Sequence, residues 1–141
     1  MTNSDSKKTI LCVDDETTSL MVRKMLLDSQ GYRTLAAKDG QQALSIFAAE
    51  AVDLVMLDYM MDGMNGGEVA ERIKQVNPSV PVLLLSAYVD LPQQILSLVD
   101  KYLTKGEGPA VMLATVAELL TDGRPRSHPA TPPSGERGRT G

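Results

Sequence analysis

The sequence lacks the features of a membrane protein, a disulfide-stabilised protein or a histidine-dependent enzyme. No apolar run approaches the roughly 20 residues that cross a membrane, and residues 1–8 contain no apolar core of a signal peptide. The only cysteine, Cys12, stands in an apolar segment without a partner, so we interpret it as a small buried hydrophobic residue. The only histidine, His128, falls in a C-terminal segment without large apolar residues, which removes it from catalysis in the folded part. These absences predict a cytoplasmic protein.

The composition suits one globular domain whose charge is unevenly distributed. The chain has 141 residues, of which 43% are hydrophobic, enough for one core but hardly for two. Residues 123–141 carry a formal charge of +3 and the rest of the chain −7, for −4 overall. Because the part of the chain before residue 123 is acidic, non-specific binding of this part to nucleic acid is not expected. We predict a flexible N-terminus over 1–7, a folded domain over 8–121, and a disordered tail, rich in Pro, Gly and Arg, over 122–141.

Short apolar runs that end in acidic, polar or glycine residues alternate with helical apolar patterns. The runs predict strands at 9–13, 32–37, 52–58, 80–86 and 101–104. The helical patterns lie at 17–30, 40–49, 67–76, 92–99 and 109–120. In the first helix we expect an apolar stripe made of its leucines together with Met21, Val22, Met25 and Leu26; the fourth helix is short and weak. Five alternations predict an α/β fold, a doubly wound parallel sheet with helices on both faces.

Side chains that suit a cation or a phosphate stand at the C-terminal ends of four predicted strands: Asp14 and Asp15, Asp58, Ser86, and Lys105. The carboxyl ends of parallel strands meet at one edge of the sheet, where open α/β sheets bind their ligands. Carboxylates about 4 Å apart repel by about 4 kcal/mol per pair at an effective dielectric near 20, so a cation or protonation must hold them together. Oxygen ligands with space for water favour Mg²⁺, or Mn²⁺ in its place.

Four segments resemble the receiver domain of two-component response regulators, the CheY-like family. They read ILCVDDE (10–16), LDYMMDGMNG (57–66), LLSA (84–87) and KYLTK (101–105). They occur in the family's order, each at a predicted strand end, and the resemblance runs over about residues 8–120. It implies a five-stranded flavodoxin-like sheet in the order 2-1-3-4-5, with a short or irregular fourth helix in this chain.

The resemblance implies how phosphoryl transfer and metal binding are divided among the acids. Asp58 is the expected nucleophile and phosphoacceptor. A sensor histidine kinase or a histidine phosphotransfer protein would supply the phosphoryl group. Asp15, Asp58 and the backbone carbonyl of Met60 would bind Mg²⁺ directly, and Asp14 would act through water. The metal would offset the repulsion between an anionic nucleophile and an anionic donor.

The resemblance also implies phosphate ligands and a switch. Lys105, the hydroxyl of Ser86 and the backbone amide of Ala87 would bind phosphate oxygens, so Lys105 and Ser86 join Asp58 as catalytic residues. After phosphorylation Ser86 would move inward, and Tyr102 would rotate into the space behind it. The result would be a change in a protein-binding surface.

Three positions distinguish this chain within the resemblance. Met60 and Tyr88 flank the phosphate in the family, and neither side chain orients an in-line water, so we predict slow loss of the phosphoryl group. Gly106 stands where the family usually has proline, which leaves the direction of Lys105 less constrained.

Three functions are compatible with these features of the sequence. The first is a stand-alone receiver that acts as a phosphoacceptor rather than an enzyme. It would have no DNA-binding domain and would not bind a membrane. It would be a monomer or a phosphorylation-dependent dimer and would bind an unidentified downstream protein. The second is a degenerate receiver that binds proteins without phosphorylation. The third, a Mg²⁺-dependent phosphohydrolase, usually needs a second acid two residues after its nucleophile, where Met60 stands.

Overall fold

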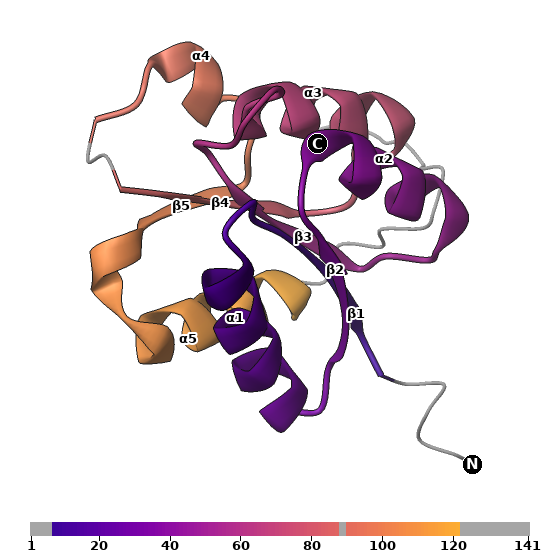
Figure 1. The fold of residues 1–141 in the computed structure, drawn as a ribbon, viewed down its shortest axis with the longest axis vertical. Helices are drawn as coiled ribbons and strands as arrows, with labels where there is room; N and C mark the ends of the chain where they lie inside the picture. The colour runs from indigo at the N-terminus through magenta and orange to yellow at the C-terminus, as the bar shows by residue number, and fades with distance from the viewer. Residues whose placement is uncertain (1–6, 88–89, 122–141) are drawn as a thin grey trace.

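The computed structural model describes residues 7–87 and 90–121 (Figure 1). Within these ranges the elements are β1 (Thr9–Val13), α1 (Thr17–Ser29), β2 (Arg33–Ala37), α2 (Gly40–Ala49), β3 (Leu54–Asp58), α3 (Gly66–Val76), β4 (Val82–Ser86), α4 (Gln93–Leu96), β5 (Lys101–Thr104), the 3₁₀ turn η2 (Lys105–Glu107) and α5 (Pro109–Leu120). Among them, no helix has both the length and the apolar character needed to cross a membrane. The predicted tail and nearly all of the predicted flexible N-terminus lie outside the described residues.

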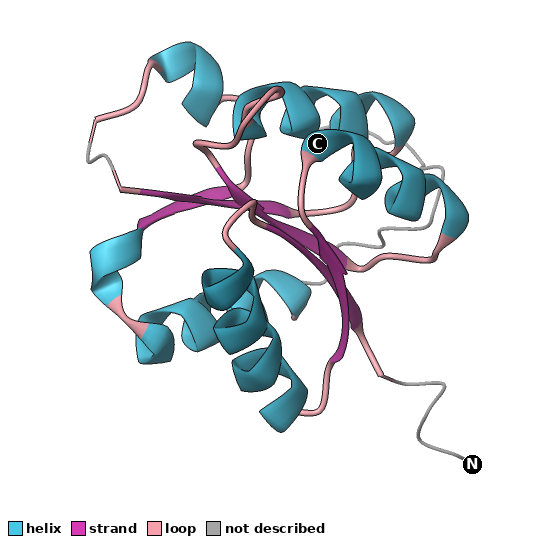
Figure 2. Cartoon of the chain, in the orientation of Figure 1, coloured by secondary structure: helices cyan, strands magenta, loops and turns pink. Residues whose placement is uncertain are grey.

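The strands form one parallel sheet in the order β2-β1-β3-β4-β5, which confirms the predicted topology. Helices α2, α3 and α4 lie on one side of the sheet and α1 and α5 on the other (Figure 2). The register pairs Val13 with Leu57, and Asp58 with Leu85. The strands therefore end nearly level, and the residues after them share one edge.

The three central strands are buried on both faces, as expected for a parallel sheet covered by two helix layers. Successive residues of β3 enter opposite cores: Val55 packs in the core beneath α2 and α3, and Met56 in the core beside α1 and α5. Both side chains are fully buried. Strand β2 lies at the edge and exposes Arg33, in agreement with its more polar sequence.

The prediction of an apolar stripe on α1 was partly wrong. Met21, Val22 and Met25 are exposed, at 59%, 51% and 68%, and the buried side chains of the helix are Leu20 and Leu27. Residues seven apart lie two helical turns apart on the same face, so this leucine pair determines which face packs on the sheet. The methionines consequently point to solvent.

Helix α4 is a single turn without a fully buried residue, which confirms the expected short fourth helix. Its contact with α3 depends on a glycine: a Cβ built on Gly67 would lie 2.7 Å from Cδ1 of Ile95. A side chain at position 67 would displace Ile95, which packs against the core beneath α2 and α3. Gly67 thus allows α4 to approach the start of α3.

Candidate functional site

Three carboxylates meet at the edge where β1 and β3 end. Asp14 and Asp15 follow β1, Asp58 ends β3, and one oxygen from each lies within 4.8 Å of the others. Asp14 and Asp58 are buried, at 0% and 3% exposed, whereas Asp15 is exposed. The strand ends therefore bring these acids together as the alternation of strands and helices predicted, with one oxygen donor facing solvent.

Lys105 pairs with the buried acid of β3. Its Nζ lies 2.6 Å from Oδ1 of Asp58, and the side chains are 36% and 4% exposed respectively. Burial raises the pKa of the Asp58 carboxyl above its ordinary value, and the Lys105 ammonium opposes that rise. Asp58 is thus a desolvated carboxylate with a fixed cation beside it.

The turn that carries Lys105 is held by Glu107. The carboxylate of Glu107 accepts hydrogen bonds from the backbone N–H of Thr104 at 3.1 Å and from its hydroxyl at 3.4 Å. Gly106, inside this turn, is not among the glycines with positive φ, and a Cβ there would meet nothing within 4 Å. A side-chain cap from Glu107 therefore orders the turn that contains Gly106.

The loop after β3 folds tightly over the acids. The backbone N–H of Asp62 donates to Oδ2 of Asp15 at 3.0 Å, and that of Gly66 donates to the carbonyl of Tyr59 at 2.8 Å. A Cβ on Gly66 would lie 2.6 Å from the carbonyl oxygen of Asp58, so only glycine fits this close approach. The loop thereby positions both Asp15 and the end of β3.

Among the described residues, the other predicted site residues lie on, or directly after, the strands that form this edge. Ser86 ends β4 next to β3 and is 1% exposed, and Ala87 follows it and is exposed. Tyr102 is half-buried in β5, and Met60 exposes 54% of its surface in the loop after β3. Tyr88 lies outside the described residues.

Comparison with known proteins identifies the family. Residues 10–117 match the response regulator receiver domain. The chain belongs to this family. It is 34% identical to the alkaline phosphatase synthesis transcriptional regulatory protein PhoP of Bacillus subtilis over 130 residues, 90% of this chain and 52% of PhoP. It is 33% identical to the phosphate regulon transcriptional regulatory protein PhoB of Pseudomonas aeruginosa over 118 residues, 80% of this chain and 52% of PhoB. The receiver domain thus spans about half the length of these relatives.

Solved structures show the same fold. The response regulator TrrA of Thermotoga maritima, crystallised in complex with Mg²⁺-BeF, has a TM-score of 0.74 and 34% identity, covering 80% of this chain and 99% of TrrA. A CheY-like receiver domain protein of Methanospirillum hungatei has a TM-score of 0.76 and 28% identity, covering 81% of this chain and 94% of that chain. The chain is therefore similar to receiver domains over its folded part.

The donor set of this receiver domain fits Mg²⁺. The cluster consists of carboxylate oxygens only, and one of its acids is exposed, which leaves space for water ligands. Mg²⁺ takes few protein ligands and retains several waters, so two or three carboxylates at the edge of a sheet suit it. The acidic cluster has the character of the Mg²⁺ sites typical of receiver domains.

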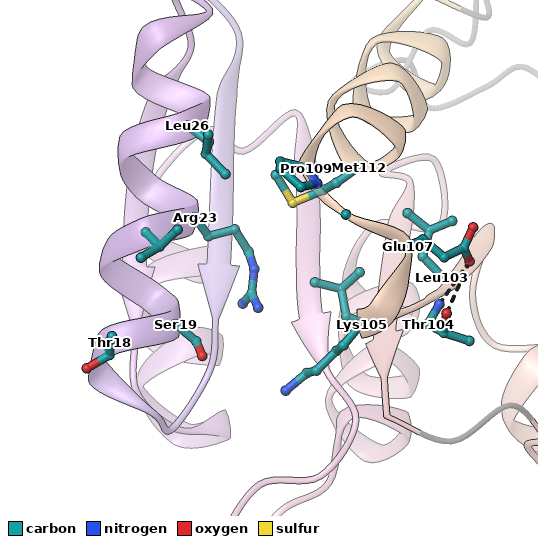
Figure 3. Close-up of a pocket in the computed structure, with 13 residues that line it drawn as sticks. Thr18, Ser19, Arg23, Leu26, Leu103, Thr104, Lys105, Glu107, Pro109 and Met112 are labelled. Carbon is teal, nitrogen blue, oxygen red and sulfur yellow. Dashed lines mark hydrogen bonds between the residues drawn. The ribbon is translucent and has the colours of Figure 1, made fainter.

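Two residues of the site, Arg23 and Glu107, are not among those predicted from the sequence. Nη1 of Arg23 lies 2.9 Å from Oδ2 of Asp14. Arg23 stands between Leu20 and Leu27 on the inward face of α1, and a charged residue on such a face signals a buried partner. Figure 3 shows Arg23 extending from α1 toward the side on which Lys105 lies, across a cavity of about 360 Å³.

Proposed function

We propose that Asp58 of this receiver domain accepts a phosphoryl group from the phosphohistidine of a sensor histidine kinase or of a histidine phosphotransfer protein. The observation that supports this most directly is the contact of 2.6 Å between the buried Asp58 carboxylate and Lys105, inside a cluster of three carboxylates. Such a site combines a fixed nucleophile with a fixed cation and oxygen ligands for a metal. Receiver domains are generally phosphoacceptors rather than enzymes.

Asp58 acts as the nucleophile. An oxygen of its carboxylate attacks the phosphorus, the bond between phosphorus and the donor imidazole nitrogen breaks, and the electron pair of that bond returns to the imidazole. The product is an acyl phosphate on Asp58. Lys105 neutralises charge on the transferring group, while the Ser86 hydroxyl and the Ala87 amide donate to phosphate oxygens.

The metal ligands in this proposal are Asp15, Asp58 and the backbone carbonyl of Met60, with Asp14 acting through water. When bound, Mg²⁺ (or Mn²⁺) offsets the negative charge of the acceptor and of the donor phosphate. Asp14 suits an indirect role because both of its oxygens already accept hydrogen bonds, from Arg23 and from the backbone of Glu16 at 2.9 Å each.

The output in this proposal is the binding of another protein. Phosphorylation adds charge and three acceptor oxygens next to Ser86, which moves toward them, and Tyr102 of the neighbouring strand follows into the vacated space. Tyr102 is half-buried and pairs with Leu84 of β4, the strand that Ser86 ends, which supports this role. The exposed Met60 side chain offers no group to orient a water, which supports a slow loss of the phosphoryl group.

Incubation with acetyl phosphate and Mg²⁺, followed by intact-mass spectrometry, tests the proposal. The chain is expected to gain one phosphoryl group, and Asp58→Asn is expected to gain none. Asp62→Asn is the matched control, since it neutralises an exposed acid of the adjacent loop and should leave the gain intact. An unmodified wild-type chain would favour a phosphorylation-independent interaction module, and turnover of phosphate esters would favour a phosphohydrolase.

A further inference from the structure

Arg23 occupies one side of the acidic cluster. Its guanidinium Nη1 lies 2.9 Å from Oδ2 of Asp14, and the two side chains are 11% and 1% exposed. The other oxygen of Asp14, Oδ1, accepts the backbone N–H of Glu16 at 2.9 Å. Asp14 is therefore a buried carboxylate whose two oxygens are both engaged by donors of its own chain.

This pair differs from the other ion pair of the same helix. Lys24 and Asp28 also lie 2.9 Å apart, but their side chains are 45% and 44% exposed, so solvent screens them. Arg23 and Asp14 are almost entirely removed from water, where a charge acts more strongly on its neighbours. Arg23 is the charged residue of α1 whose removal would most change the potential at the cluster.

Two cations flank the three carboxylates. Lys105 contacts Asp58, Arg23 contacts Asp14, and both cations line the cavity between α1 and the turn after β5 (Figure 3). Asp15 instead accepts a neutral backbone N–H from Asp62. Three negative charges and two positive charges leave one net negative charge. The repulsion within the cluster is therefore far weaker than among three carboxylates alone.

We propose that Arg23 is an internal counter-ion of the metal site: it holds the carboxylates together without metal and thereby weakens the binding of Mg²⁺. This inference rests on the proposed Mg²⁺ site. A guanidinium beside the cluster repels an incoming dication, and it also supplies part of the charge neutralisation that the dication would otherwise provide alone. Arg23 acts through Asp14, so it is a positioning residue that determines how strongly this receiver domain depends on metal.

Calorimetric titration of the 141-residue chain with MgCl₂ measures the effect directly. Arg23→Met is expected to bind Mg²⁺ about tenfold more tightly than the wild type, the order of effect for one charge near a dication in a partly solvated site. Arg23→Lys, which retains the charge, should stay close to the wild type. Lys24→Met is the matched control because it removes the same charge from the same helix, and it should change the affinity less than about twofold.

Thermal melting gives a second measurement. In EDTA, Arg23→Met should melt below the wild type, because Asp14 loses its counter-charge, and saturating Mg²⁺ should raise its melting temperature more than that of the wild type. A purely structural role for Arg23 would weaken metal binding when the residue is lost, not tighten it. If Arg23→Met does not fold in EDTA, Arg23→Gln retains a hydrogen-bond donor without the charge and should show the same tightening.

The outcomes separate the two proposals. Unchanged or weaker Mg²⁺ binding by both Arg23→Met and Arg23→Gln would overturn the role of Arg23. An absence of Mg²⁺ binding by the wild-type chain would instead overturn the metal site in the proposed function. Tighter binding by both variants, with wild-type behaviour in Lys24→Met, would establish the counter-ion role.

Discussion

The ammonium nitrogen of Lys105 lies 2.6 Å from a carboxylate oxygen of Asp58, and the lysine is partly exposed whereas the acid is almost fully buried. The cation therefore reaches the acceptor from the solvent side, where a phosphoryl group would also arrive. In the proposed phosphoryl transfer, this contact makes Lys105 the cation expected to act on the incoming group.

Lys105→Met should slow phosphorylation by acetyl phosphate roughly a hundredfold, the usual effect of removing one preorganised charge or donor from a transition state. The rate of mass gain at fixed acetyl phosphate and Mg²⁺ measures it. Lys101→Met, at the other end of β5, removes an exposed lysine and should leave the rate unchanged. Equal rates in both variants would contradict a direct role for Lys105.

Glu107→Ala should lower the phosphorylation rate without unfolding the domain. The carboxylate of Glu107 caps the turn through Thr104, so its loss frees the segment that directs Lys105 toward Asp58. Loss of about 1 kcal/mol of positioning corresponds to a rate about fivefold lower. Glu107→Gln retains an acceptor oxygen and should retain most of the rate; a full loss in this variant would show that the charge, not the hydrogen bonds, matters.

Gly66→Ala should destabilise the domain by about 2 kcal/mol, within the range typical of overpacking. Its Cβ would lie 2.6 Å from the carbonyl oxygen of Asp58, so either α3 or the end of β3 must shift. Gly106→Ala is the matched control, because a Cβ there meets nothing within 4 Å, and it should be neutral or slightly stabilising. Urea denaturation of the two variants measures the difference, and equal midpoints would contradict the close approach at Gly66.

Cys12 should make the stability of the domain fall at alkaline pH. Burial raises the pKa of its thiol from 9.0 to about 12. As the pH rises above 9.0 the unfolded chain loses this proton while the folded chain retains it, so folding becomes less favourable by about 1.4 kcal/mol per pH unit until about 12.

Urea denaturation at pH 8 and pH 10 tests the contribution of Cys12. The wild type should lose more stability over this interval than Cys12→Val, which keeps a small apolar side chain but cannot ionise. The folded wild type should also resist thiol reagents at pH 8. An identical change with pH in the two chains would show that the thiol stays accessible or that other groups dominate.

The sheet and the acids could be predicted because both follow from local sequence. Asp58 ends an apolar run, and parallel strands bring such ends to one edge whatever the rest of the chain does. The face that a helix turns toward the sheet is harder to predict. Met21 and Met25 have the spacing of a buried stripe, and periodicity alone does not determine which stripe faces the sheet. The position of Arg23 depends on that face, so its contact with Asp14 required the packed structure.

Helix α4 is held at the start of α3 chiefly by Ile95, which lies in the space that Gly67 leaves open. Helix α4 is a single turn without a fully buried side chain, so its detachment exposes little apolar surface to solvent. Local opening of α4 therefore requires much less free energy than global unfolding. Residues 90–100 should consequently exchange their amide hydrogens as a unit of their own, faster than the neighbouring strands β4 and β5. A partner that binds this corner would then meet a segment able to rearrange while the sheet stays intact.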